Sequence, residues 1–428
     1  MKLPADSCPR GVLSLMRGWP GAGWRTVSAA TADRVQYSER FEVDHGRMSL
    51  ARTAGCLIAC ALALAACAGA GVPTPAPQAA GSPAEAGLPA ASAPPALSGD
   101  AAAAAPAGDT PPAADTVRLG VLSAASDAGF FIAQDLGYFK EQGIELEMSP
   151  FDSAARMVAP LGAGQLDAGG GAHSAGLYNA VARGIDLKLV ADKGSSPPGF
   201  GFQALLFRKD LADSGQLRSP ADLRGRKVAL PAHGITTEVA LAAWLRQGGL
   251  TLADADVTEL GFPEHVTAMA SGSVDASVTI EPFVTRIVDQ GTGTVYQRTD
   301  ELLPGYQIAE VIYGGPFIQS QPDAARRFMV AYLKGVRYYN DAFVKHDAAK
   351  REQAVAILTR NTTVKDPALY DRMVMPGLAP DGHMNMASLA EDQDFWLSTG
   401  LQPTRINVDD VVDHSFADAA DRTLGPYR

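Results

Sequence analysis

Hydrophobic positions follow two repeating patterns along the chain from about residue 116 onward. Short apolar stretches with alternating polar positions predict strands, and apolar residues spaced three or four apart predict helices. The predicted strands are 117–122, 144–148, 166–168, 203–208, 223–230, 257–260 and 308–313. The predicted helices begin near residue 130 and also cover 154–161, 174–183, 238–247, 265–270, 324–345, 352–360, 368–373 and 387–399. Strands that alternate with helices indicate an α/β fold with mainly parallel sheets covered by helices.

Two short segments of the chain resemble each other. Gly-Gln-Leu-Asp-Ala at 164–168 matches Gly-Ser-Val-Asp-Ala at 272–276 in spacing and chemistry. We therefore expect two copies of one α/β unit, with Asp167 and Asp275 ordering the turn before a strand in each. The stretches 203–208 and 308–313 lie where the chain passes between the units. This arrangement predicts two lobes, two hinge crossings and a cleft at the carboxyl ends of the strands.

A glycine-rich segment at 162–184 is the strongest local candidate for a binding site. We expect Gly169 to Gly171 to form a turn between a strand and a helix, with His173 and Ser174 beside it. Unpaired N–H groups and the positive end of a helix dipole at such a turn suit an anion. The alternative is that the glycines only tighten the connection between the strand and the helix.

Charge and cysteine content narrow the function further. The formal net charge of −11 and the lack of a basic cluster argue against nucleic-acid binding. Histidines after residue 100 are scattered, without metal-ligand spacing, and no metal or cofactor is expected. The four cysteines, Cys8, Cys56, Cys60 and Cys67, all precede residue 68, so the lobes contain no thiol or disulfide.

The first 115 residues have the composition of a leader and a tether. Arg47 and Arg52 precede an apolar run at 55–66, as in a secretory signal, and the run is too short to span a membrane. Leu-Ala-Ala-Cys at 64–67 resembles a bacterial lipobox, which would make Cys67 the acylated first residue of the mature protein. Residues 68–115 are mostly Ala, Pro, Gly, Ser and Thr, a composition that predicts a disordered tether. The translation start, Met1 or Met48, stays open.

Several motifs together carry a resemblance to one family. They are FIAQDLGYFKEQGI at 131–144, GQLDAG at 164–169, DLRGRKV at 222–228, SGSVDA at 271–276 and Glu281-Pro282. From Val117 to about Val295 the chain resembles the substrate-binding proteins of ABC importers for sulfonates, nitrate and thiamine-pyrimidine precursors. The resemblance implies a two-lobed periplasmic-binding-protein fold of type II. Its first lobe would consist of residues 116–205 and 311–428, the latter with the C-terminal helices, and its second lobe of residues 206–310. It implies a monomeric receptor, not an enzyme, that passes a small molecule to a permease and its ATPase.

The resemblance also places a ligand pocket. It implies contacts from the segments 123–131, 170–174, 192–195, 234–238 and 279–281. The candidate ligand-binding residues are Ser123, Ser126, Phe130, Gly170, Gly171, His173, Ser174, Asp192, Gly234, Thr236, Thr237, Glu238 and Glu281. Asp192, Glu238 and Glu281 would suit a ligand with a cation or ring N–H donors, and each could instead be a helix cap or a surface charge.

Two other functions stay open at this level. A pyrimidine-precursor synthase has the same fold but needs a cysteine-rich iron site, and no cysteine follows Cys67. A sensor or scaffold lipoprotein would keep the fold without a permease. Whether it is an importer receptor or a sensor or scaffold, a protein anchored at Cys67 is expected in the periplasm or at the outer face of the cytoplasmic membrane. The inner leaflet of the outer membrane is the alternative place for the anchor.

Overall fold

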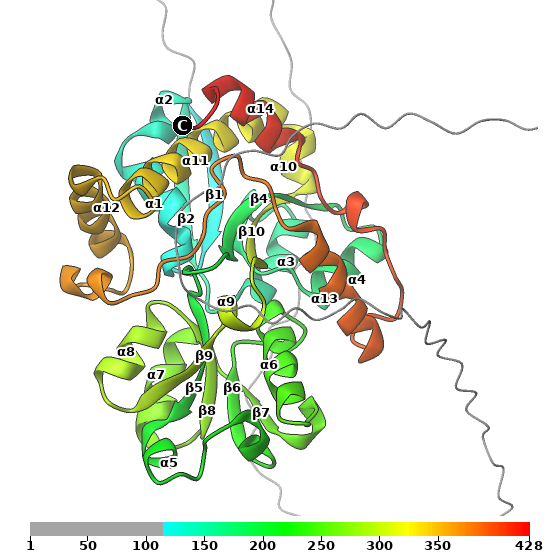
Figure 1. Cartoon of the computed structure of the whole chain (residues 1–428). Helices are drawn as coiled ribbons and strands as arrows, with labels where there is room; N and C mark the ends of the chain where they lie inside the picture. The colour runs from blue at the N-terminus through cyan, green and yellow to red at the C-terminus, as the bar shows by residue number, and fades with distance from the viewer. Residues whose placement is uncertain (1–113) are drawn as a thin grey trace, which may run out of the picture. The chain divides into compact units, whose positions relative to one another are not determined.

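The computed structural model describes residues 114–428, so the leader, Cys67 and nearly all of the tether lie outside the described residues. The first lobe contains a five-stranded sheet in the order β2-β1-β3-β10-β4. Its strands are β1 (Asp115–Val121), β2 (Ile144–Pro150), β3 (Ala168–Gly171), β4 (Leu187–Ser196) and β10 (Tyr306–Gly314). Only β10 runs antiparallel to its neighbours. Figure 1 shows this sheet and that of the second lobe as two groups of strands with helices around them.

The second lobe repeats the same arrangement, with the order β7-β6-β8-β5-β9. Its strands are β5 (Gln203–Arg208), β6 (Lys227–Leu230), β7 (Asp256–Glu259), β8 (Ala276–Ile280) and β9 (Gly293–Arg298). Here β5 is the antiparallel strand. In each sheet, the strand that follows a passage between lobes is therefore the antiparallel one. The predicted two-lobed α/β fold with mainly parallel sheets is confirmed.

Asp167 and Asp275 play matching structural roles in the two sheets. The Asp167 carboxylate accepts hydrogen bonds from the backbone N–H and the guanidinium of Arg118 on β1, at 2.7–2.9 Å. Asp275 accepts from the backbone N–H of Lys227 on β6 at 3.1 Å and pairs with Arg208. Each carboxylate thus fixes the start of one parallel strand against its neighbour, which is the internal repeat expected from the sequence.

The glycines at 169–171 differ from the expectation. They form strand β3 rather than a turn, and none has a positive φ. Close packing is what requires small residues here, because a Cβ at Gly171 would lie 2.4 Å from the Cβ of Ala154. The glycines of this segment that do have a positive φ are Gly164, at +68° before β3, and Gly184, at +87° just beyond the end of α4.

The helices cover the sheets and end in a long C-terminal region. The α-helices are α1 (Ala128–Asp135), α2 (Tyr138–Glu141), α3 (Val158–Gly162), α4 (Ala175–Ala182), α5 (Lys209–Asp213), α6 (Thr236–Gln247), α7 (Phe262–Ser271), α8 (Phe283–Asp289), α9 (Thr299–Leu302), α10 (Gly315–Ser320), α11 (Pro322–Phe343), α12 (Ala348–Asn361), α13 (Met386–Ser398) and α14 (Ser415–Leu424). Short 3₁₀ helices are η1 (Ala125–Asp127), η2 (Ala154–Met157), η3 (Pro220–Leu223), η4 (Leu252–Asp254), η5 (Pro367–Asp371) and η6 (Val408–Asp410). None of the helices in residues 114–428 is long and apolar enough to cross a membrane.

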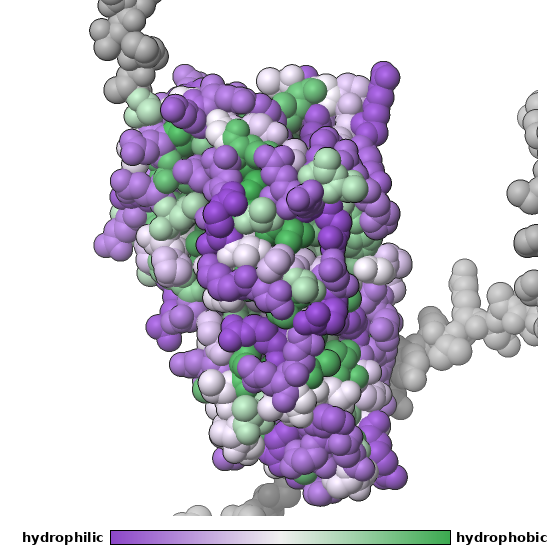
Figure 2. Space-filling view, turned by 90° about the vertical axis from the view of Figure 1, so that its left-hand side faces the viewer, coloured by the Kyte–Doolittle hydropathy of each residue, from purple (hydrophilic) through white to green (hydrophobic). Residues whose placement is uncertain are grey.

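Apolar side chains are concentrated in the interior. Each sheet has hydrophobic clusters on its faces, and one cluster of the second lobe also contains Ala124, Tyr306 and Ile308 from the first. Hydrophilic residues predominate on the face seen in Figure 2, where hydrophobic residues form small separate areas. The chain crosses between the sheets at 197–202 and 299–305, and β5 and β10 span the predicted boundaries at 205/206 and 310/311. Apolar packing therefore continues from one lobe into the other beside these crossings.

Candidate functional site

A small cavity lies between the lobes, at the carboxyl ends of their parallel strands. Its volume is about 20 Å³, which is room for about one water molecule. The lining residues come from both lobes and from the strands that join them: Leu122, Ser126, Ala154, Ala172, Phe202, Ile235, Thr236, Thr237, Phe262, Ile280, Ile308 and Ala309. The loops after β1, β2, β3, β6 and β7 and the end of β8 converge there. This is the position where open α/β sheets bind ligands.

Ser126 on the first lobe is backed by a buried ion pair. The Lys193 Nζ donates to Ser126 Oγ at 2.9 Å and lies 2.8 Å from Asp127 Oδ1. The Asp127 Oδ2 atom also accepts from the backbone N–H groups of Leu122 and Ala124, so it holds the loop after β1. Neither charged side chain of the pair is exposed to solvent. The wall of the cavity at Ser126 is therefore a fixed structure rather than a mobile loop.

On the second lobe, two threonines at the start of α6 line the cavity. The Thr237 Oγ1 accepts from Gln203 Nε2 at 3.2 Å, and the Gln203 Oε1 accepts from Thr299. The neighbouring Thr236 Oγ1 donates to the backbone carbonyl of Ile308 on β10 at 3.2 Å. The two hydroxyls therefore differ, because Thr236 donates to the other lobe, whereas Thr237 only accepts a hydrogen bond among the described residues.

The segment predicted to hold an anion is used for contact between the lobes. The backbone N–H of Ala175, in the first turn of α4, donates to the carbonyl of Gly234 at 2.8 Å. The Ser174 Oγ accepts from the backbone N–H of Leu177 as the N-cap of α4, and Ser174 forms a β-bridge with Ile235. Neither Ser174 nor Gly234 lines the cavity. In this structure these polar groups pair with each other or within α4.

The three acidic candidates are buried, and each binds backbone N–H groups. Asp192 accepts from Ala379 N and from Gln307 Nε2, both at 2.7 Å, and burial raises its pKa to about 7. Glu281 accepts from the backbone N–H of Thr285 and Val374, and lies 3.3 Å from Arg298. Glu238 accepts from Gly234 N and pairs with His233 Nδ1, both at 2.7 Å. In this structure Asp192 and Glu281 hold the C-terminal segment, and Glu238 holds the loop before α6.

His173 lies in a buried ionic cluster behind the cavity wall. Its Nδ1 is 3.0 Å from Glu310 Oε1, and its Nε2 is 2.9 Å from Asp392 Oδ2. Burial alone would lower the pKa of His173, but the two carboxylates outweigh it and raise that pKa to about 10. Tyr306 donates to Asp392 and also contacts the backbone carbonyl of Thr236. The cluster therefore joins β10 and α13 to the start of α6 in the second lobe.

The remaining candidates lie beside the cavity or in the core. Phe130 packs against the ring of Tyr332, with centroids 4.7 Å apart, and does not line the cavity. A Cβ at Gly170 would meet Phe130 and Lys193 within 2.7 Å, so this glycine leaves room for the lysine side chain. Ser123 is half-buried, with φ +55°, in the loop after β1. Of the thirteen residues proposed from sequence, only Ser126, Thr236 and Thr237 line the cavity.

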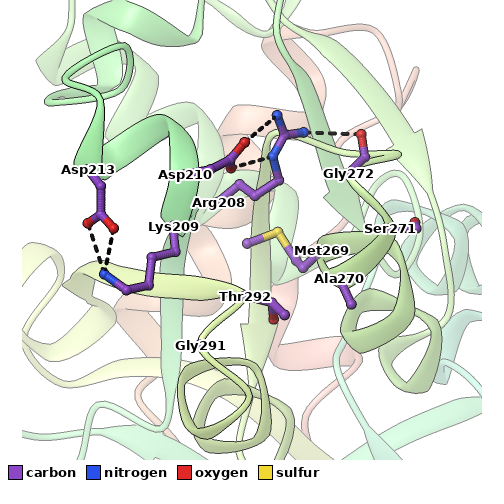
Figure 3. Close-up of a pocket in the computed structure, with 10 residues that line it drawn as sticks. All are labelled: Arg208, Lys209, Asp210, Asp213, Met269, Ala270, Ser271, Gly272, Gly291 and Thr292. Carbon is purple, nitrogen blue, oxygen red and sulfur yellow. Dashed lines mark hydrogen bonds and ion pairs between the residues drawn. The ribbon is translucent and has the colours of Figure 1, made fainter.

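A larger groove lies at the opposite edge of the second sheet, where β5 ends (Figure 3). Its volume is about 510 Å³, and its charged residues pair among themselves: Arg208 with Asp210, and Lys209 with Asp213. It faces away from the carboxyl ends of the parallel strands. Within residues 114–428, no group of three or more His, Cys, Asp or Glu side chains is arranged to hold a metal ion.

The fold and the cavity together define a two-lobed α/β binding protein of type II. The chain belongs to the NMT1-like family, whose profile matches residues 110–359. It is 25% identical over 264 residues to a putative aliphatic sulfonates-binding protein of Escherichia coli (strain K12), which is 60% of this chain and 76% of the relative.

Solved structures share the fold at low identity. The alkanesulfonate-binding protein of Xanthomonas axonopodis pv. citri, bound to MOPS, superposes with a TM-score of 0.57 at 20% identity, covering 71% of this chain and 98% of its own. The nitrate-binding protein of Synechocystis PCC 6803 gives 0.60 at 16% identity, covering 73% and 89%.

Half of the twelve lining residues lie outside the segments that the resemblance implied: Leu122, Ala154, Phe202, Phe262, Ile308 and Ala309. They are ordinary apolar residues whose patterns only predict a core. The sequence of β4 contains Lys188 and Lys193, and it does not show that Lys193 is the buried one, which needs a partner.

Proposed function

We propose that this chain is the extracytoplasmic solute-binding component of an ABC importer. It captures a small molecule between its lobes and presents it to a permease and its ATPase. The observation that supports this most is the small cavity between the lobes, which takes its wall from both sheets and from the strands that join them. A ligand held there contacts both lobes at once, so binding favours the closed arrangement. The hinge in this proposal is formed by the crossings 197–202 and 299–305.

A binding role is preferred over catalysis because the relatives are named for binding. Sulfonates, taurine and nitrate appear in the names of the similar proteins, and they define the first ligand classes to test. Thiamine-pyrimidine precursors, which the family resemblance suggested, define another. Sulfonate-like and pyrimidine-precursor-like compounds are therefore the two ligand classes of the proposal.

The ligand site can be tested with two matched substitutions in the full chain. A compound that binds only the native protein raises the free energy of unfolding by about 2.7 kcal/mol at a hundredfold excess over its Kd. We expect a hit among sulfonates, taurine, nitrate and neutral pyrimidines in a thermal-shift screen. Ala172→Phe, which fills the cavity, is expected to abolish that shift, whereas Ala270→Phe in the groove of Figure 3 should leave it unchanged.

Two results would contradict the proposal. One is a screen in which no compound stabilises the protein. The other is a shift that survives Ala172→Phe and disappears in Ala270→Phe, which would move the site to the groove at the far edge of the second sheet.

We also propose that Cys67 carries a lipid anchor. Cys67→Ser is expected to move the protein from the washed membrane fraction to the soluble fraction, since the acyl chains supply the membrane affinity. Ligand binding should not change, because a tether rich in Ala, Pro and Gly separates Cys67 from the lobes. Fractionation followed by immunoblotting measures this. A variant that stays in the membrane fraction would indicate a different anchor.

A further inference from the structure

The wall of the cavity between the lobes is mainly apolar. Nine of its twelve residues are Ala, Leu, Ile or Phe, and the polar members are Ser126, Thr236 and Thr237. A ligand that fills such a wall gains most of its affinity from apolar area removed from water. Its body therefore has to be apolar over most of its surface.

Charges close to the cavity are already compensated. Lys193 lies behind Ser126 and pairs with Asp127, and both side chains are fully buried. His173 lies between Glu310 and Asp392, so the cluster behind Ala172 is rich in carboxylates. No lysine or arginine is among the residues that line the cavity in the described part of the chain. An anionic group placed there would lose its hydration without gaining a free cation, which is strongly unfavourable.

Two hydroxyls, one from each lobe, remain as hydrogen-bond donors toward the cavity. Ser126 Oγ already accepts from Lys193 Nζ, and Thr237 Oγ1 already accepts from Gln203 Nε2. A hydroxyl has one proton to donate, and no acceptor for either proton is found among the described residues. Their burial is nearly complete, at 1% exposure for each residue. A ligand with a hydrogen-bond acceptor would satisfy both.

We propose that the ligand is an uncharged molecule with an apolar body and a hydrogen-bond acceptor, such as a carbonyl, sulfone or ring-nitrogen group, held by Ser126 and Thr237. This inference rests on the proposed function and narrows it, because it excludes free alkanesulfonates, taurine and nitrate as preferred ligands. In the complex, the acceptor bridges one hydroxyl from each lobe, and the apolar body lies between Phe202, Phe262 and Ile308. The lobes must open to admit the ligand and must close around it with these walls further apart than here, since the cavity in this structure holds only about 20 Å³.

The test compares matched compounds that differ in charge. Methyl phenyl sulfone and benzenesulfonate have nearly the same shape, and hexyl methyl sulfone and hexanesulfonate form a second pair. Calorimetry with the full chain is expected to give a Kd at least tenfold lower for the sulfone in each pair. Small-angle X-ray scattering with the sulfone is expected to show a smaller radius of gyration than with the sulfonate.

Two substitutions test the hydroxyls, with one control. Ser126→Ala and Thr237→Val are each expected to weaken sulfone binding by about three- to tenfold, the loss of one neutral hydrogen bond. Thr267→Val is the control, because that hydroxyl donates to Glu264 within α7, away from the cavity. Unfolding curves of each variant without ligand identify any loss of folding.

The outcomes separate the two proposals. Tighter binding of the sulfonates, with loss in Ala172→Phe, would overturn the uncharged-ligand inference and leave the receptor function intact. Sulfone binding that is unaffected by Ser126→Ala and Thr237→Val would also overturn it. Failure of all four compounds to bind overturns this inference, and if the wider screen also fails, the receptor proposal fails with it.

Discussion

Replacing Lys193 by methionine is expected to lower the free energy of unfolding by about 3–5 kcal/mol. The ammonium group lies 2.8 Å from Asp127 Oδ1, and both side chains are completely buried. Methionine fills a similar volume but leaves the Asp127 carboxylate without a counter-charge in the interior. Asp127 also organises the loop after β1 through the N–H groups of Leu122 and Ala124, so the loss should extend to the cavity wall. Urea denaturation monitored by circular dichroism measures the change.

Lys188 provides a control on the same strand. It belongs to β4, but its side chain is 30% exposed and its nearest carboxylate, Asp186, is 3.9 Å away. Lys188→Met should therefore change the free energy of unfolding by less than about 1 kcal/mol. Adding Asp127→Asn to Lys193→Met should recover part of the loss, because an amide needs no counter-charge. Equal effects of Lys193→Met and Lys188→Met would show that the buried pair contributes little.

The arrangement of the lobes could be predicted because it depends on local patterns. The repeat at 164–168 and 272–276 marked the same point of two α/β units, and Asp167 and Asp275 do fix equivalent strands. The strands at 203–208 and 308–313 marked the passages between lobes, and the structure has β5 and β10 there. Such features need only residues close in sequence and the period of the hydrophobic pattern.

The site could be predicted only in part, because its chemistry depends on partners far apart in the sequence. The carboxylates of Glu310 and Asp392 lie beside His173 although both are more than 130 residues away along the chain. Asp192 likewise binds the backbone of Ala379. A sequence shows which side chains are polar but not which of them have partners within the protein, so it could not show the contacts of Ser174 with Leu177 or of Glu281 with Thr285.

The expected consequence of the His173 cluster is a fall in stability as the pH rises from about 6.5 to about 10. The folded protein holds the proton on His173 more tightly than the unfolded chain, because its pKa is raised from 6.5 to about 10. The stabilisation is fully present below pH 6.5 and is lost as the pH rises through the folded pKa. Within that window the loss approaches about 1.4 kcal/mol for each pH unit.

His173→Phe should remove this dependence and also lower stability at pH 6 by about 3–5 kcal/mol, because Glu310 and Asp392 would remain buried without the cation. His383→Phe is the matched control, since that side chain is 50% exposed and pairs with Asp418 at the surface. The measurement is the free energy of unfolding of the three proteins at pH 6 to 10, and the difference between each variant and the parent isolates one histidine. If the difference in free energy of unfolding between the parent and His173→Phe stayed constant from pH 6 to 10, His173 would not titrate in this range. The charge of His173 would then not be what stabilises the cluster that joins α13 and β10.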